Sequence, residues 1–140
     1  MYLATTSLTE YWDKNSEILF LGEWCKRYDN RNDWINLNYK TVPFHWDNIQ
    51  KRYEDFQYIR ELSERFLAQL TGILNSIHGT KLSKRSWRII VGHWLTLFIE
   101  QVFDRYHCLE MARSSFEIHS TWITESKIES FTPIDISEFS

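Results

Sequence analysis

The fold of this chain is decided by the stretch ILFLGEWC at residues 18–25. Its first four residues are apolar without alternation, a pattern typical of a strand that is covered on both faces in a parallel sheet. Gly22 permits a tight exit from this strand, and Glu23 follows at the carboxyl end. Open α/β sheets bind ligands at that edge, so Glu23 is either one wall of a binding cleft or the partner of a nearby Arg or helix N-terminus. The polar residues 25–34 are expected to form a loop.

Three other stretches have the composition of short strands. MYLATTS at 1–7 stops in hydroxyl residues, INLNYKTVPF at 35–44 ends near a proline, and FEIHSTWI at 116–123 lies in a Ser/Thr-rich tail. Thr5 and Thr6 fall at the end of the first of these strands. Their hydroxyls there either meet a phosphate or a sugar, or simply close a turn.

The hydrophobic period then changes to spacings of three and four residues, which mark one face of a helix. We place this helix at about residues 47–78. Asp47, with Gln50 three places on, has the pattern of a capping box, and Gly79 is a left-handed stop. The apolar face comprises Ile49, Tyr53, Phe56, Ile59, Leu62, Phe66, Leu70, Ile73 and Ile77.

A second helix is predicted at about residues 83–113. Ser83 is a good N-cap, and apolar residues continue at helical spacing from Trp87 to Leu109. Because few residues separate the two helices, they must run antiparallel.

Short strands before a long helix pair indicate a helix-rich α/β fold with parallel strands. A doubly wound sheet needs more βα units than this chain offers, so the pattern predicts an incomplete Rossmann-like N-terminal half. We expect residues 1–115 to hold the strand and loop region with the helix hairpin. Residues 116–140 are expected to be a polar tail or linker toward a missing domain.

Composition and charge narrow the class of protein. The chain has 140 residues, 43% of them hydrophobic, which suits one packed domain. The net charge of −3 gives no strong overall field for nucleic acid. Cys25 and Cys108 form neither a disulfide framework nor a metal pair, so no metal is expected. The apolar run at 89–103 is too short to span a bilayer, and the N-terminus lacks a signal peptide, which favours a cytoplasmic location.

Two aromatic clusters carry candidate site residues. In FHWD at 44–47, His45 is a candidate general base that Asp47 could orient. The alternative is that Asp47 only caps the following helix. Trp46, like Trp24 in the GEWC cluster, offers a ring that could stack on a sugar.

A small basic group and a histidine mark the second helix. Arg88 follows Lys81, Lys84 and Arg85. A helix N-terminus with an Arg favours anions, including an anionic membrane surface, although a solvated surface explains these charges equally. His93 lies in an apolar stretch, either as a core histidine or as a binding residue.

Several strings together resemble a transferase family associated with bacterial gene clusters for surface carbohydrates such as lipopolysaccharide or capsule. The similarity runs from about Leu3 to TPIDISEF at 132–139. The strings are LATTSLTEYWD, ILFLGEWC, FHWDNIQKRYEDFQYIRELSERFLAQL, LNSIHG, SKRSWRIIVGHWL and FDRYHCLEMA.

The resemblance implies a glycosyltransferase-like fold and activity. It implies that this chain is the N-terminal, acceptor-side portion of a transferase, inactive alone, with a nucleotide-activated sugar donor held by a missing C-terminal region or a partner chain. No cofactor is expected in this chain, a saccharide acceptor is implied, and the site would lie in the cytoplasm near the inner membrane. Within it, Glu23 and His45 are the catalytic candidates. The rival hypothesis is a non-enzymatic helix-hairpin module that forms homo- or hetero-oligomers.

Overall fold

The computed structural model describes residues 1–123 of the chain. They fall into two compact units. The first joins residues 1–44 to the residues from 107 onward, and the second is formed by residues 45–106. Residues 124–140 of the predicted tail lie outside the described part, and so does the string at 132–139.

In residues 1–123 the sheet has four short strands, β1 (Tyr2–Ala4), β2 (Ile18–Phe20), β3 (Tyr39–Thr41) and β4 (Ser120–Thr121). All pairs are parallel and the strand order is β3-β2-β1-β4. Each strand lies within a stretch that the sequence predicted as a strand. The prediction of a helix-rich α/β fold with short parallel strands and two long helices is therefore confirmed.

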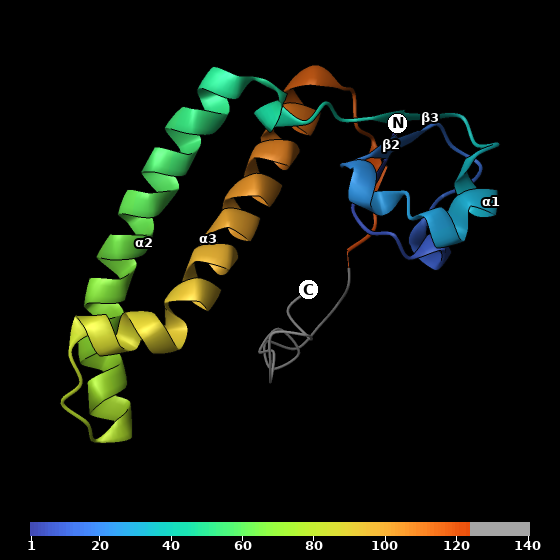
Figure 1. Cartoon of the computed structure of the whole chain (residues 1–140). Helices are drawn as coiled ribbons and strands as arrows, with labels where there is room; N and C mark the ends of the chain where they lie inside the picture. Colours follow the sequence, from blue (N-terminus) through green and yellow to red (C-terminus); the bar gives the residue numbers. More distant parts are fainter. Residues whose placement is uncertain (124–140) are drawn as a thin grey trace. The chain divides into compact units, whose positions relative to one another are not determined.

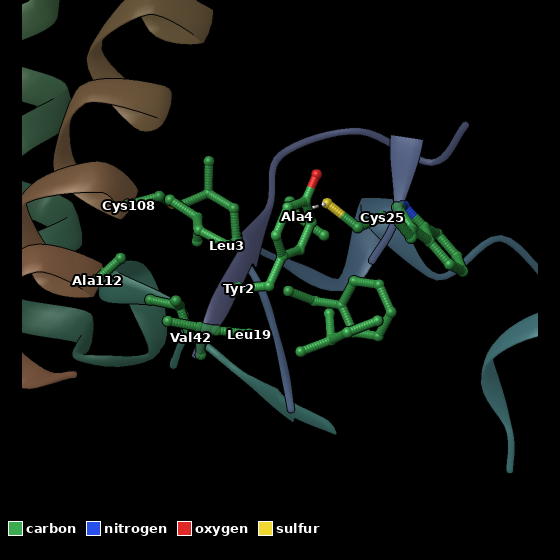
Figure 2. Close-up of a cluster of buried hydrophobic side chains, with 12 residues drawn as sticks. Tyr2, Leu3, Ala4, Leu19, Cys25, Val42, Cys108 and Ala112 are labelled. Carbon is green, nitrogen blue, oxygen red and sulfur yellow. Dashed lines mark hydrogen bonds between the residues drawn. The ribbon is translucent and has the colours of Figure 1, made fainter. Parts of the chain in front are cut away.

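The core of the first unit forms around β2. Ile18, Leu19 and Phe20 are fully buried, which explains why this run is apolar without alternation. Figure 2 shows Cys108 and Ala112 beside the side chains of the sheet in the same cluster. Both cysteines are buried, and the Cys25 Sγ donates to the carbonyl oxygen of Ala4 at 3.5 Å.

Short helices join the strands. η1 (Thr9–Tyr11) lies between β1 and β2, and η2 (Glu23–Cys25), η3 (Tyr28–Asn30) and α1 (Arg31–Trp34) lie between β2 and β3. The loop expected at 25–34 is thus partly helical. Elements of three or four residues are too short to show a hydrophobic period, so the sequence pattern could not reveal them.

The second unit is built on a helix hairpin. η4 (His45–Asp47) leads into α2 (Ile49–His78), and α3 (Lys84–Ser115) follows. The helices run antiparallel (Figure 1), since Tyr58 on α2 meets Phe103, whereas Asn75 accepts a hydrogen bond from the indole of Trp87. Among the helices in the described residues, none is both long and apolar enough to cross a membrane.

The helix ends follow the capping rules, with one correction. Gly79 ends α2 in the left-handed conformation at φ 62°, and the Ser83 hydroxyl accepts from the amide of Ser86 at 3.2 Å. The expectation that Asp47 caps α2 is wrong. Asn48 is the N-cap, and its Oδ1 accepts from the amide of Lys51 at 3.0 Å.

The packed seam of the hairpin differs from the predicted apolar face of α2. The buried positions of α2 are Ile59, Ser63 and Leu67. Ile59 and Leu67 form one hydrophobic cluster with Trp87, Leu95 and Ile99 of α3. Much of the predicted face is exposed instead, at Ile49, Tyr53, Phe56, Phe66, Ile73 and Ile77. The apolar arc of α2 is wider than one helix can cover, so its period predicts the helix but not the seam.

Candidate functional site

The first group of candidate residues gathers at the carboxyl edge of the sheet. Because β1 and β2 are parallel, Thr5 after β1 and Glu23 after β2 leave the sheet at the same edge. The chain runs from β1 to β2 and β3 on one side and returns to β4 on the other side of β1. The change of direction lies between β1 and β4, at the strand that Thr5 follows, and open α/β sheets bind ligands at the carboxyl edge at such a point. Glu23 follows the neighbouring strand β2.

Glu23 presents an exposed and oriented carboxylate at this edge. Its side chain is 79% exposed, and its Oε1 accepts from the Nζ of Lys26 at 2.9 Å. Lys26 is only 10% exposed, and its ammonium lies 4.9 Å from the ring centre of Tyr39 and 5.8 Å from that of Trp34. The cation is therefore held on two rings and in turn orients Glu23. The sequence offered a nearby Arg as an alternative partner of Glu23. The structure shows an ion pair of this kind, but with Lys26.

Gly22 and Trp24 fit together by shape. A Cβ atom on Gly22 would lie between 2.0 and 2.4 Å from three carbon atoms of the Trp24 ring. Gly22 has an extended backbone with φ −173°, so the glycine makes room for the indole, in place of the expected tight exit from the strand. Trp24 is half-buried and packs against the core of the first unit. The pair fixes the backbone on both sides of Glu23.

The two threonines have different surroundings. Thr6 closes a turn, since its Oγ1 accepts from the amide of Leu8 at 3.2 Å and its carbonyl accepts from the indole of Trp12 at 2.8 Å. Asn30 ties down the same segment by donating its side-chain amide to the carbonyl of Ser7 at 3.1 Å. Thr5 is exposed at the end of β1, and of the two it is the one placed to meet a ligand.

His45 belongs to the second unit and is almost completely buried. Its Nε2 lies 2.9 Å from Oδ1 of Asp104, and its Nδ1 lies 4.0 Å from Oδ2 of Asp55. Because a carboxylate only accepts hydrogen bonds, Nε2 must carry a proton. Asp104 therefore fixes the orientation and the proton position of the ring, the role that the sequence assigned to Asp47. Asp47 is exposed.

Both carboxylates also accept hydrogen bonds from basic side chains, and one of them accepts from an indole. Asp104 accepts from Arg105 at 2.8 Å, and Asp55 accepts from Lys51 at 2.5 Å and from the indole of Trp46 at 3.0 Å. The indole NH of Trp46 is thus used inside the protein. No pattern near His45 in the sequence indicates Asp104 or Asp55 as a partner of the ring. His45 and Asp104 are 59 residues apart, a separation that local patterns cannot bridge.

Arg88 and His93 line a separate pocket of about 210 Å³ between α2 and α3. The Nη2 of Arg88 donates to both carboxylate oxygens of Glu64, at 2.8 and 2.6 Å. Hydrogen bonds from Lys84 and then Arg88 lower the pKa of Glu64, and burial opposes them. His93 is exposed, so it is not the core histidine that the sequence suggested.

The pocket and the His45 cluster are distinct places in the second unit. Arg88 and Asp104 are sixteen residues apart on α3, which corresponds to about 24 Å along the helix axis.

The fold and the carboxyl edge together define an α/β protein with an exposed carboxylate where such sheets bind ligands. Over residues 1–140 the chain matches the model of the LIC12162 family transferase, and it belongs to that family. No curated protein and no solved structure matches it.

Proposed function

We propose that this chain is the acceptor-side, N-terminal portion of a glycosyltransferase-like enzyme of surface-polysaccharide biosynthesis, with Glu23 as the residue that contacts the acceptor. The observation that carries the proposal is the exposed carboxylate of Glu23, held by Lys26 at the carboxyl end of β2. Membership of a transferase family supports it.

In the proposed reaction, Glu23 accepts the proton of an acceptor hydroxyl as the hydroxyl oxygen bonds to the anomeric carbon of the donor sugar. The bond from that carbon to the nucleotide phosphate breaks, and the phosphate leaves with the bonding electrons. The nucleotide-activated donor would be held by a further region or a partner chain. This chain alone is then expected to bind acceptor but not to transfer sugar. We place the reaction in the cytoplasm, near the inner membrane.

Glu23 is a better candidate for substrate contact than His45. The side chain of Glu23 is 79% exposed, whereas that of His45 is 1% exposed. Within the proposal, Thr5 and Trp24 neighbour Glu23 on the acceptor side, and the His45 ring oriented by Asp104 is a second candidate base.

The test is sugar transfer by a member of the family that also carries a donor-binding region. Glu23→Gln keeps the size of the side chain and removes the base, so we expect transfer to fall by about 100-fold or more with unchanged thermal stability. Glu10→Gln is the matched control, because Glu10 is an exposed glutamate of the same unit on η1. Equal turnover of the wild type and Glu23→Gln would refute the role of Glu23.

A second candidate function is a helix-hairpin interaction module. It is favoured by large apolar side chains that are exposed on both helices, among them Ile73 at 54% and Ile90 at 60%. Sedimentation velocity over a range of concentrations tests it. A single monomeric species at all concentrations would refute self-association through the hairpin.

A further inference from the structure

Gly92 lies well inside α3, a helix of 32 residues. A glycine inside a helix costs about 1 kcal/mol relative to alanine, so its presence calls for a local reason. Close approach of the two helices is not that reason. A Cβ atom on Gly92 would meet Arg88 of its own helix, with Cγ at 3.1 Å and Cβ at 3.7 Å, and among the described residues no atom of α2 lies within 4 Å.

Gly92 instead leaves room for the stem of the Arg88 side chain, and both residues line a pocket. The pocket of about 210 Å³ lies at Gly92, and its apolar walls are Leu67 of α2 and Leu95 of α3. By the volume of liquid water, this space corresponds to about seven water molecules. It is large enough for one edge of a sugar ring and too small for an oligosaccharide. We call it the Gly92 pocket.

The polar groups of the Gly92 pocket come from both helices and include donors and acceptors. Glu64 offers carboxylate oxygens, Arg88 a guanidinium fork and His93 a ring that can do either. The hydroxyls of Ser63 and Thr96 donate to the carbonyls of the residues four places before them, at 2.8 and 3.0 Å, so their oxygens can still accept.

The charges favour a neutral ligand over an anion. Arg88 and Lys84 are both engaged with Glu64, at 2.6 and 2.8 Å. A phosphate or carboxylate would approach the negative charge of Glu64 and would have to draw Arg88 away from it. Neighbouring hydroxyls of a sugar can instead donate to the carboxylate and accept from the guanidinium while that ion pair stays in place.

We propose that the Gly92 pocket is a saccharide subsite that binds one edge of a sugar ring through its hydroxyl groups. The choice of a saccharide deepens the proposed transferase function and rests on it. The lowered pKa of Glu64 fits the proposal, since the carboxyl is then an ionised acceptor at neutral pH.

The experiment is an NMR titration of the ¹⁵N-labelled full chain with glucose, with N-acetylglucosamine and, separately, with inorganic phosphate. We expect at least one of the sugars, at millimolar concentrations, to shift the amide signals of Gly92, His93 and Thr96. No shifts with either sugar, or shifts that lie elsewhere, would overturn the proposal. Shifts at these residues with phosphate but not with sugar would show an anion site and would overturn it as well.

Gly92→Ala is the decisive variant because its methyl group would lie 3.1 Å from Cγ of Arg88 and so would displace a side chain that lines the pocket. Gly72→Ala is the matched control. Gly72 lies inside α2, and a Cβ atom there has no described atom within 4 Å. We expect Gly92→Ala to weaken sugar binding about tenfold and Gly72→Ala to leave it unchanged. Melting curves of both variants verify that they are folded, and equal binding by Gly92→Ala and wild type would refute the pocket.

The titration needs no donor and no turnover. Loss of transfer in Glu23→Gln and loss of sugar binding in Gly92→Ala are therefore separate outcomes, and the proposed function and the proposed subsite can fail independently.

Discussion

The backbone beside Glu23 depends on how Gly22 and Trp24 fit together, and this dependence can be measured. Gly22→Ala places a methyl carbon 2.0 Å from the nearest ring carbon of Trp24, where contacts between carbon atoms are ordinarily about 3.5–4.0 Å. The clash involves three atoms of a rigid indole that packs against the core. The ring or the backbone must therefore move by more than 1 Å, roughly the shortfall in that contact distance.

Overpacking of this kind costs typically 1–3 kcal/mol, and the rigid neighbour places Gly22→Ala at about 3 kcal/mol. Urea unfolding of wild type, Gly22→Ala, Trp24→Ala and the double variant forms a double-mutant cycle. Without the indole the new methyl group has room, so its cost should fall to about zero and the coupling energy should be about 3 kcal/mol. Additive effects of the two substitutions would refute the account of Gly22.

Three further predictions concern the hairpin. Asp104→Ala removes the partner of the buried His45 ring and should lower the free energy of unfolding, measured in urea, by about 2 kcal/mol. Asp47→Ala should lower it by less than about 0.5 kcal/mol. Equal losses would contradict Asp104 as the residue that orients His45. Glu64 has a lowered pKa, so its stabilising contribution is complete above its ordinary pKa of 4.5 and is lost as the pH falls through the lowered value. The difference in melting temperature between Glu64→Gln and the wild type should therefore shrink below pH 4.5. The change should be small because the Glu64 side chain is 45% exposed. A difference that stays constant with pH would contradict the stabilising role of the Glu64 carboxylate. Gly79→Ala should destabilise the protein by about 1 kcal/mol because the backbone at Gly79 has a φ of 62°. A higher melting temperature of the variant would refute the left-handed cap.

Local sequence signals predicted the elements of this fold well. The run at 18–21 indicated a strand buried on both faces, and Ile18, Leu19 and Phe20 are fully buried. Gly79 and Ser83 marked the turn between the long helices because their roles depend on their own backbone conformation and the adjacent amides. Such signals lie within a few residues and can be read from one sequence.

Signals that depend on distant residues could not be read in this way. The sequence identified His45 but not its contact with Asp104, because the partners come from different elements 59 residues apart. A glycine is needed at position 22 because the Trp24 ring occupies the place of a Cβ atom. The sequence indicated a tight exit from the strand as the reason for this glycine instead. The seam of α2 likewise depends on which part of a wide apolar arc meets α3, and the helical period alone does not select it.

We propose that this chain supplies the acceptor side of a sugar transferase through Glu23. The most direct measurement is transfer by the remainder of a longer family member, produced without the region that corresponds to residues 1–140, with this region added back as a separate chain. We predict no transfer by the remainder alone, recovery with the wild-type chain, and no recovery with Glu23→Gln. Full transfer by the remainder alone, or equal recovery with both chains, would contradict the claim.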